Sequence, residues 1–314
     1  MEKLHVGTCS WSDRSLLESG WYPHFVSNSE NRLRFYSERF STVEVDSTFY
    51  ALPHESSVYR WVVQTPPGFI FNIKAYGLFT YHKVSYNSLP QWIRNELPQP
   101  VHGQRIQHQN VPFPLRRALW KQFVTLVTPL HQMGRLGYIL FQLPPWFKYS
   151  RPALKYFERL AEITPPFKVA IEVRHRSWFN KGRNDLEILL RDSNMAYVIV
   201  DEPQLSWTVP AERLVTATWG SVIRFHGRNA EMWQKKGASV QERFSYLYTN
   251  EELTEWKGSI ENISQDVAVT FIMFNNCYKD YAVQNALEMQ RVLGLRSFVP
   301  TAVQKKLDFN DEDK

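Results

Sequence analysis

The chain has 314 residues, a formal net charge of +6 and a sequence pI near 9.2. Hydrophobic residues make up 43% of it and aromatic residues 15%, which is enough for one large α/β domain or two smaller ones. No apolar stretch approaches the roughly 20 residues of a membrane-spanning helix, so we expect no membrane partner. The Lys and Arg residues are dispersed, which argues against a nucleic-acid-binding tail. A strand-like segment begins almost at once and the two cysteines, Cys9 and Cys277, make no disulfide framework, so we expect a cytoplasmic protein without a signal peptide.

Short apolar runs, each closed by a polar residue, recur along the whole chain. In order they are Leu4–Trp11, Thr42–Asp46, Phe69–Lys74, Tyr138–Gln142, Val169–His175, Tyr197–Asp201, Val222–Arg228 and Val269–Asn276. Segments with helical spacing lie between or after them, at 31–40, 56–63, 115–133, 153–163, 185–191, 251–263 and 282–293. Alternating strands and helices are typical of a parallel sheet, because each parallel connection needs a crossover. Eight such strands predict an α/β fold with a single (β/α)8 TIM-like barrel.

The turn after the first strand argues against an open dinucleotide-binding sheet. That fold needs several glycines there, whereas GTCSW holds only Gly7. We therefore expect one barrel domain over residues 1–300, with an acidic, disordered tail at 307–314. Residues 81–114 are polar and rich in Pro, Asn, Gln and His, and they predict a long insertion after the third strand. We expect it to lie as a loop over the C-terminal ends of the strands, because loops of this length are often functional covers.

Side-chain alternation predicts which strand-end residues share a pocket. Glu172 with Arg174, and Arg224 with His226 and Arg228, lie two apart and therefore on one face of their strands. Polar groups are costly in a packed barrel layer, so we expect them at the open C-terminal mouth, where barrel enzymes have their active sites. The predicted pocket comprises Glu44, Lys74, Gln142, Glu172, Arg174, Asp201, Arg224, His226, Asn275 and Asn276.

Structural roles are the alternative for each of these groups. Glu172 with Arg174 could be an internal ion pair that orients loops, and His175 and His226 could be core histidines bound to backbone groups. Aromatic residues after strand ends, such as Trp11, could line the pocket or belong to the core. The convergence of several charged groups favours a functional site.

The polar strand ends also carry a resemblance to a known family. GTCSW (7–11), VEVDSTFY (43–50), QLPPWF (142–147), EVRHRSW (172–178), RFHGR (224–228) and FNN (274–276), followed by Asn285-Ala286, resemble the YecE-like family, called domain of unknown function 72. The match runs in order from about Gly7 to Gly294 and implies a TIM barrel without an established activity. The family usually reads Gly-Thr-Ser-Gly-Trp in the first motif, and Asn where this chain has Asp46, which adds a negative charge near Glu44.

The residue types favour a hydrolase or lyase acting on a small anionic, phosphate-bearing substrate such as a nucleotide, nucleic acid or sugar phosphate. Arginine and lysine suit phosphate, so the predicted substrate-binding residues include Lys74, Arg174, Arg224 and Arg228, together with Gln142, His175, Asn275, Asn276 and Trp11. A general base would come from Glu172, Glu44 or Asp201, with His226 as the proton shuttle. Asn275 and Asn276 could donate hydrogen bonds to developing negative charge.

Three other hypotheses remain open from the sequence. Glu172, Asp201 and His226 could hold a divalent metal, although the neighbouring arginines would repel it and no HExxH spacing is present, so no cofactor and no metal ligand are predicted. A glycoside hydrolase-like carboxylate pair could use Glu44 with Glu172 or Asp201. A non-catalytic nucleic-acid binder would use the basic charge and the aromatic residues. The oligomeric state is left open.

Overall fold

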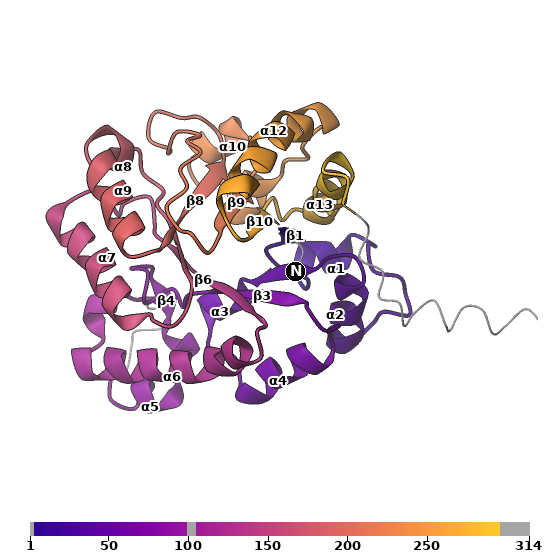
Figure 1. The fold of residues 1–314 in the computed structure, drawn as a ribbon. Coiled ribbons are helices and arrows are strands. Elements are labelled where there is room, and N and C mark those ends of the chain that lie inside the picture. The colour runs from indigo at the N-terminus through magenta and orange to yellow at the C-terminus, as the bar shows by residue number, and fades with distance from the viewer. Residues whose placement is uncertain (1–2, 99–104, 296–314) are drawn as a thin grey trace, which may run out of the picture.

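Eight parallel strands close into a barrel in this computed structural model, which describes residues 3–98 and 105–295 (Figure 1). Around the barrel the order is β1-β10-β9-β8-β7-β6-β3-β2. The barrel strands are β1 Leu4–Thr8, β2 Thr42–Val45, β3 Ile70–Lys74, β6 Leu136–Gln142, β7 Val169–Glu172, β8 Ala196–Asp201, β9 Ser221–Phe225 and β10 Thr270–Phe274. Each strand corresponds to one predicted run, so the predicted TIM-like barrel is confirmed. The expected tail at 307–314 lies outside the described residues.

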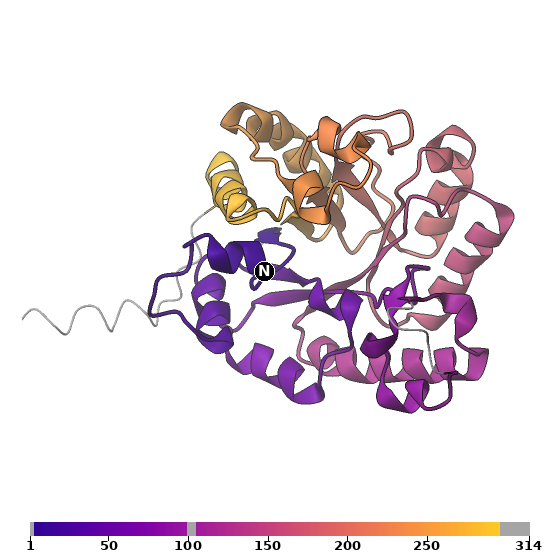
Figure 2. The same ribbon diagram turned by 180° about the vertical axis from the view of Figure 1, so that it is seen from behind.

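Helices surround the barrel on its outside, as the view from behind also shows (Figure 2). The longer ones are α2 Ser29–Ser37, α4 Glu55–Val63, α6 Phe113–Gln132, α7 Arg151–Ile163, α9 Arg183–Asp192, α12 Asn250–Asp266 and α13 Tyr281–Val292. Short helices follow several strand ends: α1 Arg14–Glu18, α3 Ser47–Tyr50, α8 Ser177–Asn180, α10 Ala230–Gln234 and α11 Val240–Phe244. All seven predicted helical segments are present, and their ends differ from the predictions by a few residues.

Local sequence explains where these helices begin and which face they bury. The hydroxyl of Ser150 accepts a hydrogen bond from the backbone of Ala153 and caps α7. Thr249 and Glu252 form a reciprocal capping box at the start of α12. One stripe of each helix is apolar and packs on the strands; in α7 it contains Ala153, Leu154, Phe157 and Leu160.

The register of the strands defines which side chains face the barrel interior. Arg224 of β9 is aligned with Val200 of β8 and Met273 of β10, and Gln142 of β6 is aligned with Glu172 of β7. Near the other end of the barrel, Gly137 leaves room for Asn72, because a Cβ at Gly137 would lie 2.1 Å from Oδ1 of Asn72. The charged residues Glu44, Glu172 and Arg224, in contrast, contact one another nearer the C-terminal ends of the strands.

The insertion after β3 is a small folded unit rather than an irregular loop. β4 Val84–Ser85 and β5 Arg105–Ile106 pair antiparallel, α5 spans Gln91–Arg94, and 3₁₀ turns cover Tyr86–Ser88 and His108–Asn110. Its apolar side chains form a second core with the start of α6, made of Tyr76, Leu78, Val84, Tyr86, Leu89, Ile93, Leu97, Ile106, Val111 and Leu119. The polar composition of residues 81–114 did not predict this core.

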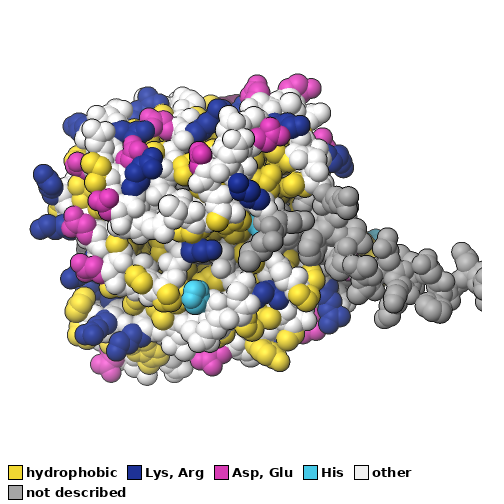
Figure 3. Space-filling view, viewed as in Figure 1, with side chains coloured by type: hydrophobic (Ala, Val, Ile, Leu, Met, Phe, Trp, Pro, Cys, Tyr) yellow, Lys and Arg dark blue, Asp and Glu magenta, His cyan; other side chains and the backbone are white. Residues whose placement is uncertain are grey.

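Charged side chains of both signs are mixed on the molecular surface. On the face drawn in Figure 3, Lys and Arg side chains are interspersed with Asp and Glu side chains. This agrees with the dispersed basic residues of the sequence and shows no single-sign patch on that face. Within the part of the chain that the structure describes, no helix is long and apolar enough to cross a membrane.

Candidate functional site

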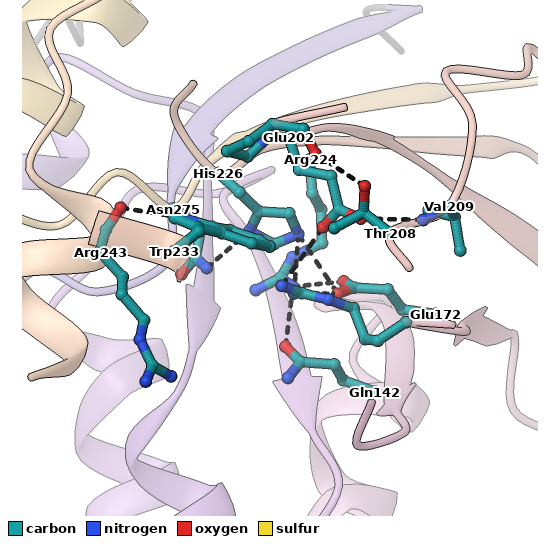
Figure 4. Close-up of polar contacts among 12 residues, drawn as sticks. Gln142, Glu172, Glu202, Thr208, Val209, Arg224, His226, Trp233, Arg243 and Asn275 are labelled. Atoms are coloured by element: carbon teal, nitrogen blue, oxygen red, sulfur yellow. Dashed lines mark hydrogen bonds and ion pairs between the residues drawn. The ribbon is translucent and has the colours of Figure 1, made fainter. Parts of the chain in front are cut away.

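Arg224 lies at the centre of a buried charge cluster near the C-terminal ends of the strands (Figure 4). Its Nη2 donates to Oε1 of Glu44 at 2.6 Å and lies 3.4 Å from Sγ of Cys9, and its Nη1 donates to Oε1 of Gln142 at 3.0 Å and to Glu172. The side chains of Arg224, Glu44 and Glu172 are fully buried. Two carboxylates thus neutralise one guanidinium, and this guanidinium is closed to solvent.

A second cation, Arg174, lies beside the first and is slightly more accessible, with 7% of its surface exposed. Its Nη1 donates to Oε1 of Glu172 at 2.8 Å, and its Nη2 lies 3.3 Å from Oε2 of Glu202. The ring of Trp233 covers the guanidinium at 5.1 Å. Nε2 of His226 is 3.3 Å from Nη1 of Arg174 and 3.2 Å from Oε1 of Glu172, so this imidazole borders the Arg174–Glu172 pair.

A third cation, Lys74, is paired with Asp46, which lies two residues after Glu44 in the chain. Its Nζ lies 3.2 Å from Oδ2 of Asp46 and 5.0 Å from the centre of the Phe49 ring. Lys74 is 7% exposed, and Oδ1 of Asp46 has no hydrogen-bond donor. Asp46 follows β2 and Lys74 is the last residue of β3, whereas Arg174 and Glu202 follow β7 and β8.

Burial and charge divide the four carboxyl groups of the site into two classes. Burial is the largest influence and raises the pKa of Glu172 and of Glu44, but the charge of Arg224, together with the other cations and hydrogen bonds around each group, holds both below their usual range. Burial raises the pKa of Glu202 to about 7 in spite of Arg174. Burial also raises the pKa of Asp46, which shares a hydrogen bond with Glu44 when it is protonated. Glu44 and Glu172 are therefore permanently ionised, whereas Asp46 and Glu202 exchange protons more readily near neutrality.

His226 is a neutral imidazole in this environment. Burial is the largest influence and lowers its pKa to about 4, despite the attraction of Glu172. Nδ1 of His226 lies 2.9 Å from the amide nitrogen of Asn275, which fixes the ring. The structure thus brings His226 and Asn275 to the cluster, as the sequence predicted, and makes His226 a hydrogen-bonding group at neutral pH.

Three predicted site residues lie instead between the barrel and its outer helices. Asp201 accepts hydrogen bonds from Arg228 at 2.7 and 2.9 Å, from Tyr248 at 2.8 Å and from Trp256 at 2.9 Å. Asn276 donates to the carbonyl of Tyr246 and to Oδ1 of Asn285. Asp201, Arg228 and Asn276 therefore do not meet the Glu172–Arg174–Arg224 group, because their positions face the helices.

Two other predicted residues are also placed apart from the charge cluster. The Nδ1 atom of His175 contacts Ser177 at 2.9 Å, at the start of α8. The ring of Trp11 packs edge to face on Trp61 of α4 at 5.9 Å, and its carbonyl accepts a hydrogen bond from Tyr22. Both belong to the surrounding packing.

The metal alternative required Glu172, Asp201 and His226 to converge. Asp201 faces α12 through Trp256, so the three side chains do not form one ligand set. Among residues 3–98 and 105–295, no three His, Cys, Asp or Glu side chains are grouped so that they could hold a metal ion.

Glu202 is the main site residue that sequence reasoning missed. The predicted run ended at Asp201, where β8 also ends, so the next residue was not considered, although Val198, Val200 and Glu202 alternate onto one face. Its Oε1 accepts a hydrogen bond from the backbone of Val209 at 3.3 Å, so the following loop helps to bury it. Trp233 was missed as well; it lies far from any strand end in the sequence, and its indole donates to the carbonyl of Arg243 at 3.0 Å.

Comparisons with known proteins agree with this architecture. The family described as "Protein of unknown function DUF72" matches residues 5–307. The UPF0759 protein YunF of Bacillus subtilis is 28% identical over 93% of this chain and 95% of its own length, and the UPF0759 protein YecE of Escherichia coli strain K12 is 26% identical over 74% and 78%.

Solved structures of family members have the same fold. The crystal structure of a DUF72 family protein from Thermotoga maritima has a TM-score of 0.73 and 29% identity, covering 93% of this chain and 100% of that one. One from Enterococcus faecalis has a TM-score of 0.76 and 24% identity, covering 93% and 96%. The extent of the family match, with the closed barrel, shows that this chain belongs to the DUF72 family, whose activity is not established.

Proposed function

We propose that the protein is a hydrolase or lyase acting on a small anionic, phosphate-bearing substrate at the C-terminal mouth of the barrel. One observation carries the proposal: Arg174 and Lys74, two slightly exposed cations, are each paired with a carboxyl group whose pKa burial raises toward neutrality.

The charge balance of the site supports an anionic substrate. Glu44 and Glu172 carry full negative charge and compensate Arg224 completely. Glu172 also compensates part of the positive charge of Arg174. Glu202 and Asp46, however, are protonated, and therefore uncharged, for much of the time near pH 7. Arg174 and Lys74 are then under-neutralised, and a phosphate group would restore the balance while displacing little water.

The same carboxyl groups suit general acid–base catalysis. A catalytic acid or base works best when its pKa lies near the operating pH, and burial brings Glu202 to that range. We assign the proton transfers to Glu202 and Asp46. Glu172 would hold the guanidinium of Arg174 in position. His226 would orient the substrate as a neutral hydrogen-bonding group. The glycoside alternative receives less support, because Glu44 and Glu172 are both bound to Arg224.

Phosphate binding tests the anion site directly. Titration with inorganic phosphate, followed by calorimetry at low salt, should show binding to the unmodified protein. Lys74→Met should weaken it about tenfold, as expected for loss of one charge-assisted hydrogen bond. Lys121→Met, at an exposed position on α6, removes the same charge elsewhere and should leave the affinity unchanged. Absence of binding, or an equal loss in both variants, would contradict the proposal.

Catalysis needs a separate measurement. Phosphate release or elimination from a panel of phosphate monoesters and diesters should reveal turnover. Glu202→Gln and Asp46→Asn should each lower the rate at least a hundredfold, in keeping with the contribution of a general acid or base. Both variants should still bind inorganic phosphate. Binding without turnover for every compound would instead favour a non-catalytic binder.

A further inference from the structure

An aromatic row borders the Lys74–Asp46 pair and has no role in the proposed chemistry so far. Tyr50 and Phe49 belong to α3, His82 follows β3 and Trp146 follows β6. Neighbouring rings contact edge to face: Tyr50–Phe49 at 5.1 Å, Phe49–His82 at 4.9 Å and His82–Trp146 at 5.9 Å. All four residues follow C-terminal ends of barrel strands, on the side where the charged site lies.

The two ends of the aromatic row are open to solvent. Trp146 is 62% exposed and Tyr50 is 64% exposed, whereas Phe49 and His82 are half-buried between them. Large exposed aromatic side chains are unfavourable in water and are often found where a ring or an apolar surface binds. The edge-to-face contacts hold the rings in place, so a planar group that stacks on Trp146 would meet a preformed surface.

Charge at the row matches an anionic group attached to that ring. Nζ of Lys74 lies 5.0 Å from the centre of the Phe49 ring. Burial is the largest influence that lowers the pKa of His82, to about 4, and the charges of Lys74 and Arg174 both add to it. His82 is thus a neutral ring at pH 7, and the row lies within the field of the two cations of the proposed anion site.

From this juxtaposition we propose that the substrate is a nucleotide, with its base stacked on Trp146 of the aromatic row and its phosphate group beside Lys74. The inference rests on the proposed function and names its substrate class. Stacking on an aromatic side chain accepts any base, because every base has a π face, whereas a sugar phosphate without a base would use only the cations. Lys74 supplies the charge for one phosphate group, which fits a free nucleotide better than a strand that needs several phosphate contacts.

Calorimetric titration with adenosine 5′-monophosphate, ribose 5-phosphate and inorganic phosphate separates the two contributions. The nucleotide should bind at least tenfold more tightly than ribose 5-phosphate, in the range expected for one stacked base. Trp146→Ala should remove that difference and leave ribose 5-phosphate affinity unchanged. Trp92→Ala is the matched control, because Trp92 is an exposed tryptophan of α5 that takes no part in the row. It should behave like the unmodified protein.

Each result decides between the proposals. Equal affinities for the nucleotide and ribose 5-phosphate, or an equal effect of Trp146→Ala and Trp92→Ala, would overturn the nucleotide assignment and leave the anion site intact. No binding of any phosphate compound, or phosphate binding that Lys74→Met leaves unchanged, would overturn the proposed function itself. A ten-residue oligothymidylate that binds more than tenfold more tightly than thymidine 5′-monophosphate would overturn the assignment of a free nucleotide in favour of a nucleic-acid strand.

Discussion

Nη2 of Arg224 on β9 donates a hydrogen bond to Oε1 of Glu44 on β2 at 2.6 Å, across the interior of the barrel. β10 and β1 lie between these strands in the barrel order, and the same guanidinium also contacts Glu172 on β7. With its hydrogen bond to Gln142 on β6, this one buried side chain links four separate strands. This position gives Arg224 a part in holding the site together, whereas Lys74 and Arg174 are the cations nearest to solvent.

Replacing Arg224 should therefore destabilise the protein strongly. Arg224→Met leaves Glu44 and Glu172 buried without their shared counter-charge, which typically costs about 3–5 kcal/mol of unfolding free energy. Urea denaturation at pH 7 measures the loss. The triple variant that also carries Glu44→Gln and Glu172→Gln should recover part of it, because no unpaired carboxylate then remains. A loss below about 1 kcal/mol in Arg224→Met, with phosphate binding abolished, would favour direct substrate contact by Arg224.

Glu202 should make the stability of the protein fall as the pH rises through the acid range. Its pKa is raised to about 7 in the folded protein and lies near 4.3 in an unfolded chain, so the folded state holds the proton more tightly. The stabilisation is complete below about pH 4.3 and is lost as the pH rises through about 7, with a total on the order of 3 kcal/mol. Glu202→Gln should remove this dependence. Urea midpoints measured between pH 4 and 8 for both proteins give the difference, and parallel curves would show that Glu202 is not the titrating group.

His226 should make the stability of the protein rise with pH, opposite to the effect of Glu202, over part of the same pH range. Burial lowers its pKa to about 4 from a usual value near 6.5, so the folded state gives up the proton first. Stability from His226 is present above about pH 6.5 and is lost as the pH falls through about 4. His226→Gln keeps a hydrogen-bonding side chain beside Asn275 and should flatten the acid side of the profile. An unchanged acid limb in His226→Gln would contradict the assignment.

Most of the fold could be predicted from patterns in the amino-acid sequence alone. Strands of four to seven residues alternate with amphipathic helices, and this alternation is regular enough to predict the barrel. The insertion after β3 was predicted, but its internal structure was not, because its strands and helix are only two to four residues long, too short to show a period. Its core also draws on Tyr76 and Leu78 before the insertion and on Leu119 of α6 after it, which no short window of sequence brings together.

The candidate site could be predicted only where polar residues of one strand lie two apart in the sequence and so mark the same face of that strand. Glu172, Arg174, Arg224 and His226 share a face within their own strands, and they do meet in the structure. Asp201 could not be placed in this way, because both faces of a parallel barrel strand are buried and apolar neighbours do not distinguish inside from outside. Its outward position is determined by Arg228, Tyr248 and Trp256, which come from later segments.

A variant of Asp201 tests whether this side chain faces the outer helices rather than the mouth of the barrel. Asp201→Asn replaces a carboxylate that accepts five hydrogen bonds with an uncharged group and should lower the unfolding free energy by about 2–4 kcal/mol. Its phosphate affinity should stay within twofold of the unmodified protein, because the carboxylate faces α12 rather than the mouth. Thermal and urea denaturation with phosphate titration measure both effects. Stable folding with lost turnover would return Asp201 to the role of general base.

Trp233 should control the pKa of Glu202 by keeping water from Arg174. Its ring covers the guanidinium at 5.1 Å, and its indole is anchored on the carbonyl of Arg243. In Trp233→Ala, water reaches the Arg174–Glu202 pair, so the charged carboxylate is less penalised and the pKa of Glu202 moves down toward its usual value. The Glu202-dependent change of stability with pH, measured as the difference between proteins with and without Glu202→Gln, should then have its midpoint at lower pH when Trp233→Ala is also present. Trp233→Phe retains an aromatic cover and should keep the original midpoint, since burial rather than the indole N–H sets the shift. If the alanine and phenylalanine variants shift the midpoint equally, the anchoring hydrogen bond to Arg243, and not the aromatic cover, determines the pKa of Glu202.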